Sequence, residues 1–414
     1  MKSLIEKYNH ADNVIFISSY PEKGVRYSER VCAVGGFTKN TIEAFQKKAK
    51  NKHFIVLTVT LNGKKEIYEE NGILVCRVFK RNKLSSYLSL IQTLLNFNKV
   101  KRVFIEFEFS SWGDTKTTSL FFLIPLLLKI LKKKQIIVLH QVVERLDKLN
   151  GHLGWKRKDL RRAFFNAFLR LFYKILVVLS DHIVVTEEIF KERLIQMSDH
   201  SNKIQVITHG VDTQVRMQSR DESRRLLGLP KDKFIVMYFG YLNWYKGADL
   251  FLDYAQKTSN QNIFFVLAGG KSFTYSQKKH YQNYIKKFDS LPKNVRLTGF
   301  VPEDKLGLYY SAADLLVLPY RTMMSSSGPL SLTFSFEKPV LLSSNLLPYL
   351  KSGDFAKALE KTDLKQEQLF FQLNFNDFYK KISSANMAKL AQFSRIMKKE
   401  RNYFSTIHQY LEMI

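Results

Sequence analysis

The chain has 414 residues, and its 45% hydrophobic and 14% aromatic content excludes a disordered protein. Its 65 lysines and arginines against 37 aspartates and glutamates give a formal net charge of +28. This charge favours anionic partners, namely nucleic acid, an anionic membrane surface or a polyanionic substrate, unless it only reflects a lysine-rich proteome. Cys32 and Cys76 fit neither a disulfide framework nor a metal-site spacing, so we expect a reducing compartment.

The first half of the chain alternates strand-like and helix-like segments, as parallel α/β domains do. We expect strands at 13–19, 53–60, 73–79, 102–107, 135–140, 181–186 and 204–208. We expect helices at 38–50, 85–97, 116–132 and 187–197. The start shows no signal-peptide core, and the longest apolar stretch, 119–131, is too short to span a bilayer. The sequence therefore predicts a soluble cytoplasmic protein.

A further helix, at about 156–180, separates basic from apolar residues. Its polar stripe consists of Lys158, Arg162, Asn166, Arg170 and Lys174. Its predicted apolar side consists of Phe164, Phe168, Leu171, Phe172, Ile175 and Leu179. A basic amphipathic helix can lie at an anionic membrane surface, which would make the protein peripheral on the cytoplasmic membrane face. The alternative is a domain helix with a core face and a solvated basic face.

The second half repeats the alternation. Strands are expected at 234–239, 263–268, 294–298, 314–318 and 338–342, and helices at 247–258, 275–289, 303–311 and 329–336. The polar segment 213–232 is interpreted as an inter-domain linker, and the tail from 376 onward has a helical pattern. The length suits two domains of roughly 200 residues. We expect an N-terminal domain at 1–212, a C-terminal domain at 213–395 and a last helix at 396–414.

Two segments of the second half have the pattern of a strand, a turn of small residues and a helix. In IVMYFGYLNWYKGADLFLDYA the turn contains Gly240 and Lys246. In LLVLPYRTMMSSSGPLSLTFSFEKPVLLSS it contains Ser327 and Gly328, followed by Pro329. Such turns direct backbone N–H groups and a positive helix end at a ligand above the carboxyl end of the strand. Two of them, one with a lysine, suit a diphosphate.

The two segments resemble the nucleotide-sugar half of retaining glycosyltransferases of family 4. The first turn of that family reads G-x-x-R-x-x-K-G, and the second reads S-G-x-x-x-x-A-x-x-x-G-x-P-V in one branch. Three further segments match in the family's order: ISSYP with GGFTKNTIEAF, IIVLHQ and VITHGVDT. The resemblance implies an α/β GT-B fold, in which two Rossmann-like domains face each other across a cleft. It also implies an acceptor site in the N-terminal domain, to which the last helix returns.

A nucleotide-sugar transferase must stabilise negative charge on a leaving diphosphate. The sequence contains no D-x-D motif, so we expect no metal; a cation, turn amides and a helix N-terminus would act instead. Lys246 is the predicted catalytic cation; its alternative is an exposed lysine that starts a helix. The other candidates for binding the donor phosphates or nucleotide are Gly36, Gly240, Asn243, Arg321, Ser327, Gly328 and Leu330. Gly36 has an equal alternative as an ordinary loop glycine.

A second set of candidates lies at the ends of two strands. His140 ends an apolar strand, at the edge where α/β sites form. The resemblance implies that His140 hydrogen-bonds the transferred sugar or stabilises the oxocarbenium centre. Glu106 and Glu108 are candidates for the acceptor site. Thr38 is expected to cap the helix that follows it.

The chain departs from the family at four positions. The paired glutamates of most members fall at Met324 and Leu332, the phosphate-binding arginine falls at Asn243, and a glycine falls at Glu337. Arg321 is the candidate replacement for the arginine.

The predicted function is transfer of a hexose, with retention, from a UDP- or GDP-sugar to a glycan or lipid-linked acceptor in polysaccharide biosynthesis. One alternative is an inactive GT-B module that binds a sugar nucleotide or a partner glycosyltransferase. Another is a nucleic-acid-binding or DNA-modifying protein, although no nucleic-acid motif is present.

Overall fold

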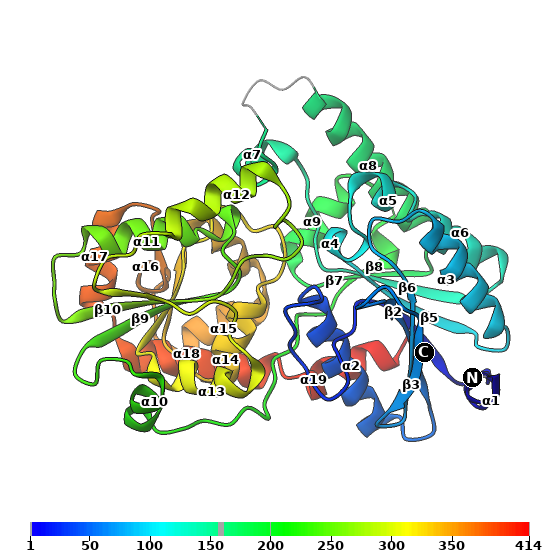
Figure 1. Cartoon of the computed structure of the whole chain (residues 1–414), viewed down its shortest axis with the longest axis horizontal. Coiled ribbons are helices and arrows are strands. Elements are labelled where there is room, and N and C mark those ends of the chain that lie inside the picture. Colours follow the sequence, from blue (N-terminus) through cyan, green and yellow to red (C-terminus); the bar gives the residue numbers. More distant parts are fainter. Residues whose placement is uncertain (1, 156–160, 199, 414) are drawn as a thin grey trace. The chain divides into compact units, whose positions relative to one another are not determined.

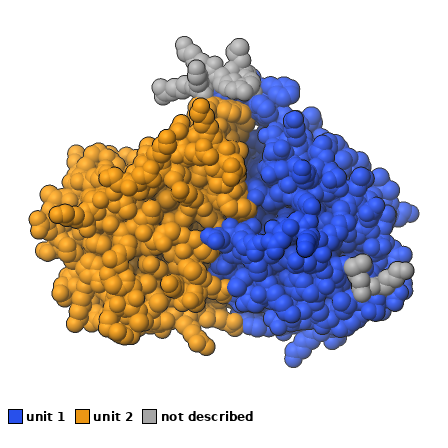
Figure 2. Space-filling model, viewed as in Figure 1, with its two compact units in different colours: residues 1–144, 161–210, 403–414 blue, residues 145–160, 211–402 orange. Residues whose placement is uncertain are grey.

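The computed structural model describes residues 2–155, 161–198 and 200–413, which form two compact units (Figure 2). Unit 1 comprises Met1–Glu144, Arg161–Gly210 and Tyr403–Ile414, and unit 2 comprises Arg145–Leu160 and Val211–Asn402. These limits differ from the division expected at 212 and 395. A segment that begins at Arg145 joins unit 2, and only the residues from Tyr403 onward join unit 1.

Unit 1 is built on an eight-stranded sheet with the order β3-β4-β2-β1-β5-β6-β7-β8. The strands are β1 (Val14–Ile17), β2 (Phe54–Val59), β3 (Glu66–Glu70), β4 (Ile73–Phe79), β5 (Arg102–Phe107), β6 (Lys134–Leu139), β7 (His182–Val185) and β8 (Ile204–Val206). All the expected strands of this half are present. The structure adds one strand that was not expected, the antiparallel edge strand β3, whose polar sequence EIYEE gave no strand pattern. The other pairings are parallel.

Helices cover both faces of this sheet. They are α1 (Lys2–Tyr8), α2 (Val34–Lys48), α3 (Ser85–Asn96), α4 (Phe109–Trp112), α5 (Thr115–Ser119), α6 (Leu123–Ile130), α8 (Arg161–Leu179), α9 (Glu188–Ile195) and α19 (Tyr403–Leu411), with a 3₁₀ turn η2 (Ser201–Lys203). The single helix expected at 116–132 is interrupted between α5 and α6. Pro125, which lacks an N–H, is tolerated because it lies in the first turn of α6.

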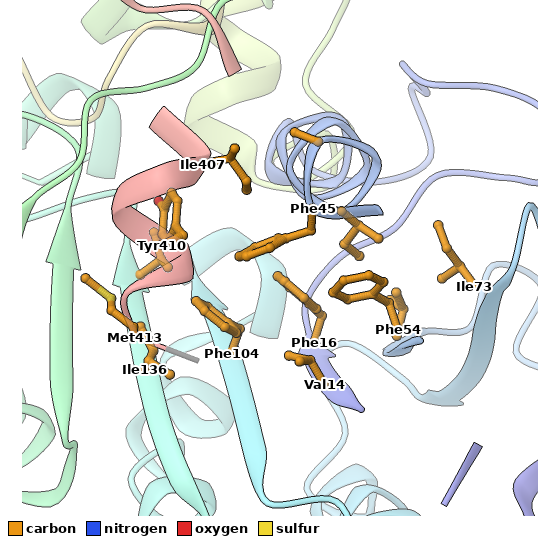
Figure 3. Packing of buried hydrophobic residues seen from close by; sticks show 14 of the residues in the cluster. Val14, Phe16, Phe45, Phe54, Ile73, Phe104, Ile136, Ile407, Tyr410 and Met413 are labelled. Atoms are coloured by element: carbon orange, nitrogen blue, oxygen red, sulfur yellow. The ribbon is translucent and has the colours of Figure 1, made fainter. Parts of the chain in front are cut away.

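The C-terminal helix α19 packs with α2 over one face of the sheet of unit 1. Its Ile407 and Tyr410, with Met413 just after the helix, join a buried cluster with Phe45 of α2 and Phe104 of β5 (Figure 3). The Tyr410 ring lies 6.2 Å from the Phe45 ring and 6.0 Å from the Phe104 ring, centroid to centroid. The last residues of the chain therefore complete the core of the N-terminal unit.

Unit 2 is built on a six-stranded parallel sheet with the order β11-β10-β9-β12-β13-β14. The strands are β9 (Phe234–Phe239), β10 (Ile263–Ala268), β11 (Val295–Leu297), β12 (Leu315–Leu318), β13 (Val340–Ser343) and β14 (Phe370–Phe371). The strand order reverses between β9 and β12. A crevice for ligands is expected at such a switch point, outside the carboxyl ends of the strands.

The helices of unit 2 surround this sheet (Figure 1). They are α7 (Asn150–Leu153), α10 (Arg220–Leu227), α11 (Ala248–Lys257), α12 (Lys279–Ile285), α13 (Glu303–Ala312), α14 (Gly328–Ser335), α15 (Gly353–Thr362), α16 (Gln366–Leu369), α17 (Phe375–Ser384) and α18 (Met387–Glu400). The 3₁₀ segments are η1 (Leu146–Leu149), η3 (Trp244–Lys246), η4 (Lys286–Phe288) and η5 (Ser344–Lys351). Within the described residues, no helix is both long and apolar enough to cross a membrane.

The interpretation of 213–232 as a linker is wrong for its middle part, which forms α10. Ser219 caps this helix by accepting a hydrogen bond from the Glu222 N–H at 3.2 Å, and Gly228 ends it with a φ of 61°. The buried Arg224 side chain then pairs with Asp314 at 2.6 Å, which fixes α10 to the start of β12. The polar composition favoured a linker, although the capping residues of a helix, Ser219 and Gly228, are both present in the sequence.

Candidate functional site

The turn that carries Lys246 is set by two glycines in conformations that other residues rarely adopt. Strand β9 ends at Phe239, Gly240 has a φ of 131°, and η3 leads to Gly247 with a φ of 72°. A Cβ atom on Gly247 would lie 1.9 Å from the carbonyl oxygen of Pro319, which follows β12. The end of η3 and the residue after β12 therefore meet backbone to backbone, and only glycine fits at position 247.

Lys246, Gly240 and the first turn of α14 lie together at this edge of the sheet. A Cβ atom on Gly240 would lie 3.4 Å from Lys246 Nζ and 3.2 Å from Pro329 Cγ. The Lys246 ammonium also lies 5.9 Å from the ring of Tyr245 and 6.0 Å from that of Tyr320. The two turns expected to bind one diphosphate thus converge, and an ammonium group lies beside a helix N-terminus, where anions are favoured.

The second turn is organised by Ser327. Its Oγ accepts a hydrogen bond from the Leu330 N–H at 3.2 Å and lies 2.8 Å from the Tyr320 hydroxyl. Its own N–H donates to the Tyr349 hydroxyl at 3.2 Å. Ser327 therefore caps α14, and the Leu330 amide is occupied by this cap. In the described part of the chain the Gly328 N–H, at the start of α14, has no such partner.

Arg321 is bound by protein groups of α11 and of the Lys246 turn itself. It binds Asp249 through two contacts of 2.7 and 3.0 Å, donates to the Trp244 carbonyl at 2.6 Å and lies 4.8 Å from the Trp244 ring. Burial alone would raise the pKa of Asp249, but the hydrogen bonds and charges of Arg321 and Lys287 hold it below its usual value. This geometry favours a role of Arg321 in supporting the Lys246 turn. Its predicted contact with phosphate stays a prediction.

Three of the four positions that differ from the family pattern are buried, and the fourth, Glu337, is partly exposed. Met324 and Leu332 are both 8% exposed, and Asn243 is buried with its Oδ1 unpaired among the described residues. Glu337 has a φ of 52°, in the region that favours glycine, and pairs with Arg395 at 2.9 Å and Lys398 at 3.0 Å. Glu337 thus holds, at a positive φ, a position that the family pattern gives to glycine.

In unit 1, His140 is held by Glu106. Glu106 is near the end of β5 and His140 directly follows the parallel strand β6. Their side chains are buried, and His140 Nε2 lies 2.7 Å from Glu106 Oε2. With Nε2 engaged by the carboxylate, Nδ1 is the ring nitrogen that remains for a further contact. Glu106 therefore has a positioning geometry, whereas its predicted acceptor contact stays untested.

A second pair lies beside the first, formed by Glu108, two residues after Glu106, and Gln141, the residue after His140. Glu108 Oε1 accepts a hydrogen bond from Gln141 Nε2 at 3.2 Å, and Glu108 Oε2 is buried without a partner among the described residues. Glu106 Oε1 is likewise buried and unpaired in the described chain. Two carboxylates thus line the carboxyl edge next to His140. Glu108 stays a predicted acceptor residue.

Phe37 joins three of the motif-bearing segments. Its ring lies 4.7 Å from His140, 5.0 Å from His209 and 5.9 Å from Tyr403, centroid to centroid. The segments that contain Phe37, His140 and His209 therefore meet in unit 1, at the start of α2. Gly36, in contrast, is packed against protein, since a Cβ there would lie 3.0 Å from the Tyr27 ring and 3.1 Å from the Arg26 carbonyl oxygen.

The expectation that Thr38 caps a helix is wrong, because α2 already begins at Val34. Thr38 lies inside the helix, where its hydroxyl donates to the Val34 carbonyl at 3.0 Å and lies 2.6 Å from Ser18 Oγ. The sequence GG argued for a loop, but both glycines belong to the first turn of α2. The predicted helix start was therefore four residues late.

Sequence reasoning missed a segment that supports the Lys246 turn from within unit 2. Helix α7 contacts η3, and a Cβ atom on Gly151 would lie 2.4 Å from the Trp244 ring. The next residue, His152, packs edge-on against Tyr245 at 5.0 Å and Tyr275 at 4.7 Å. Its burial, with smaller effects of Lys278 and His280, lowers its pKa to about 3. A glycine and a histidine in a polar stretch gave no sequence signal for this contact.

Two sequence families match the chain. The family described as Glycosyltransferase Family 4 matches residues 34–215, and that described as Glycosyl transferases group 1 matches residues 219–345. Alpha-galactosylglucosyldiacylglycerol synthase of Streptococcus pneumoniae is 28% identical over 199 residues. That alignment spans 47% of this chain and 52% of the synthase, about half the length of this relative.

Solved structures match nearly the whole chain. Sucrose-phosphate synthase of Thermosynechococcus elongatus has a TM-score of 0.68 at 15% identity, over 97% of this chain and 98% of that one. Anabaena Alr3699/HepE in complex with UDP-glucose has a TM-score of 0.64 at 13% identity, over 97% and 100%. The fold is therefore that of the GT-B glycosyltransferases, as predicted, and the family matches support a glycosyltransferase enzyme.

Proposed function

We propose that this chain is a family 4 glycosyltransferase that transfers a hexose from a UDP- or GDP-sugar to a glycan or lipid-linked acceptor. Transfer proceeds with retention of configuration and without a metal. The observation that carries the proposal is the Lys246 ammonium beside Gly240 and the first turn of α14. A cation, a glycine backbone and a helix N-terminus in one place provide what a leaving diphosphate requires.

On the donor side, the charge that develops during reaction is on the phosphate oxygens. Lys246 neutralises part of it, and the Gly328 N–H and the positive end of α14 stabilise the rest. Tyr245 and Tyr320 limit the positions of the Lys246 chain, and Arg321 with Asp249 holds the turn in shape. A UDP-glucose complex among the proteins of the same fold supports a nucleotide-sugar donor.

On the sugar side, His140 is the residue proposed to contact the hexose, through Nδ1. Its Nε2 is bound to Glu106, which fixes the orientation of the ring. In a front-face reaction the bond from the anomeric carbon to the phosphate oxygen breaks, and a bond from the same carbon to the acceptor oxygen forms on the same face. The acceptor proton passes to the departing phosphate, which needs no separate protein base.

The acceptor class is supported by one relative. The diacylglycerol named in the matching Streptococcus pneumoniae synthase supports a lipid-linked acceptor. The inactive-module alternative is favoured by Met324 and Leu332, which are buried apolar residues where most family members carry glutamates. Nucleic-acid binding remains an alternative only through the charge of +28. Sub-micromolar, sequence-dependent DNA binding at physiological salt would replace the main proposal.

The test is donor hydrolysis with a panel of UDP-, GDP- and ADP-sugars in the presence of a chelator. We expect hydrolysis of the sugar nucleotides that carry one of the three nucleotide bases. We expect Lys246→Ala to lower kcat by roughly 10²–10³-fold, which is the cost of losing one preorganised donor to a developing oxyanion. Lys231→Ala, an exposed lysine of the same unit, is the matched control and should keep full activity.

Three results separate the alternatives. Nucleotide binding without turnover identifies the inactive module. If a folded sample shows no nucleotide binding and no turnover, both the enzyme hypothesis and the inactive-module hypothesis are refuted. Turnover that disappears with the chelator and returns with a divalent cation refutes metal independence alone.

A further inference from the structure

One helical layer of unit 1 exposes an unusual share of large apolar side chains. Helices α3, α6 and α8 are neighbours, α3 and α6 contact β4 and β6, and all three lie on the same side of the sheet (Figure 1). Among the described residues, twelve large hydrophobic side chains are exposed, and eight of them lie in or next to these helices. The eight are Leu84, Leu88, Leu95, Leu126, Ile130, Phe164, Leu171 and Val178. We call this surface the α3–α6–α8 face.

On each helix the exposed apolar residues recur at helical spacing and so form one stripe. Along α3, Leu88 follows Leu84 by four residues and Leu95 follows Leu88 by seven. In α6, Ile130 follows Leu126 by four residues. Phe164, Leu171 and Val178 of α8 repeat every seven residues, and Phe164 is 69% exposed. Residues at these spacings share one side of a helix. The exposure therefore follows from the orientation of each helix and is continuous along it.

This finding corrects the predicted faces of α8. Phe164 and Leu171 belong to the predicted apolar side, and both are exposed, whereas Phe172 of the same side is buried. The other buried residues of α8 are Leu169, Tyr173, Leu176 and Val177, which the prediction did not include. The error has a physical reason: α8 is apolar on two sides, so the pattern alone did not show which side faces the sheet. Of the predicted polar stripe, Lys158 lies outside the described residues.

The helices of the α3–α6–α8 face include no aspartate or glutamate, and α6 and α8 contribute basic residues. Lys129 is exposed next to Ile130, and its Nζ lies 3.5 Å from the Val178 carbonyl, so it bridges α6 and α8. Lys174 is exposed three residues after Leu171 and four before Val178. Lys132 and Lys134 are exposed just after α6.

We infer that the α3–α6–α8 face docks onto an anionic lipid bilayer, with its leucine, isoleucine and phenylalanine side chains inserted between the headgroups. Lysines near the surface each add roughly 1 kcal/mol of attraction to anionic lipid, and their long stems let the ammonium groups reach the phosphates. Protein–protein interfaces, in contrast, are depleted in lysine. The inference rests on surface composition alone and does not depend on sugar transfer.

The experiment is sedimentation with vesicles of equal phosphatidylglycerol and phosphatidylcholine, and with vesicles of phosphatidylcholine only. The test variant combines Leu88→Ser, Ile130→Ser and Leu171→Ser, one residue from each helix, which are 65%, 68% and 55% exposed. The matched control combines Met217→Ser, Leu226→Ser and Leu347→Ser in unit 2. We expect the intact protein and the control to bind the anionic vesicles, and the test variant to lose roughly tenfold or more in partitioning.

Further measurements decide what a change in binding means. Donor hydrolysis in solution should be unchanged in the test variant, so a folding defect or a failure of the proposed function would be recognised separately. An Ile130→Trp variant should be quenched by brominated lipid, which only insertion explains. Equal binding by the test and control variants would overturn the inference. So would loss of a dimer in the test variant with vesicle binding intact, because the face would then join two copies of the chain.

Discussion

The candidate site of unit 2 consists mainly of backbone groups, whereas that of unit 1 consists of side chains. In unit 2 the site consists of backbone and one cation: Gly240, Gly247, the start of α14 and Lys246. In unit 1 it consists of side chains that contact one another, with Glu106 holding His140 and Phe37 packed on its ring. A backbone site depends on glycine conformations, which the sequence displays directly. A side-chain site depends on which strands are neighbours, which the sequence displays only indirectly.

The largest expected effect comes from a glycine-to-alanine substitution, compared between Gly247 of unit 2 and Gly36 of unit 1. Gly247→Ala places a Cβ 1.9 Å from the Pro319 carbonyl oxygen at a φ of 72°, so the η3 turn must move away from the end of β12. We expect a loss of about 3 kcal/mol or more in the free energy of unfolding, together with donor hydrolysis. Gly36→Ala meets the Tyr27 ring at 3.0 Å and the Arg26 carbonyl at 3.1 Å, where small shifts suffice, and should cost less.

Urea denaturation measures both losses. Gly353→Ala is the control, because a Cβ there has open space and no positive φ, and it should change the free energy of unfolding by less than about 0.5 kcal/mol. If Gly247→Ala were as stable as Gly353→Ala, the backbone account of the unit 2 site would be wrong.

Much of the fold and part of the site could be predicted from the sequence. Lys246, Gly240 and Ser327 were found because a strand, a small-residue turn and a helix have local signals, and the structure brings these residues together. The holding role of Glu106 could not be found, since it depends on the register that sets β5 beside β6. The α10 helix had readable signals in Ser219 and Gly228, but its polar composition argued for a linker.

The next effect tests whether the α7 contact supports the unit 2 turn. The pKa of His152 is about 3 in the folded chain, against an ordinary value of 6.5. The unfolded chain therefore binds a proton that the folded chain does not, and stability falls as the pH drops below about 6.5. At pH 5 the loss from this residue is about 2 kcal/mol. Denaturation at pH 7 and pH 5 should show it.

A His152→Phe variant keeps an aromatic ring between Tyr245 and Tyr275 but cannot titrate. Its free energy of unfolding should change less between pH 7 and pH 5 than that of the intact protein, by about the same 2 kcal/mol. An identical pH dependence in both proteins would mean that His152 is accessible to protons in the folded state, and the buried contact of α7 with the turn would be refuted.

The smallest effect concerns the side-chain site of unit 1. Glu106→Ala removes the partner of His140 Nε2, so the ring loses its fixed orientation and we expect kcat to fall roughly tenfold with little change in KM, since positioning matters most in the transition state. Glu106→Gln still offers an oxygen to Nε2 and should recover part of the rate. Glu29→Gln, an exposed glutamate of the same unit, should behave like the intact protein. A Gln variant as slow as the Ala variant would show that the charge of Glu106 matters more than its position. An Ala variant with full activity would instead separate Glu106 from the reaction, and the unit 1 site would then rest on His140 alone.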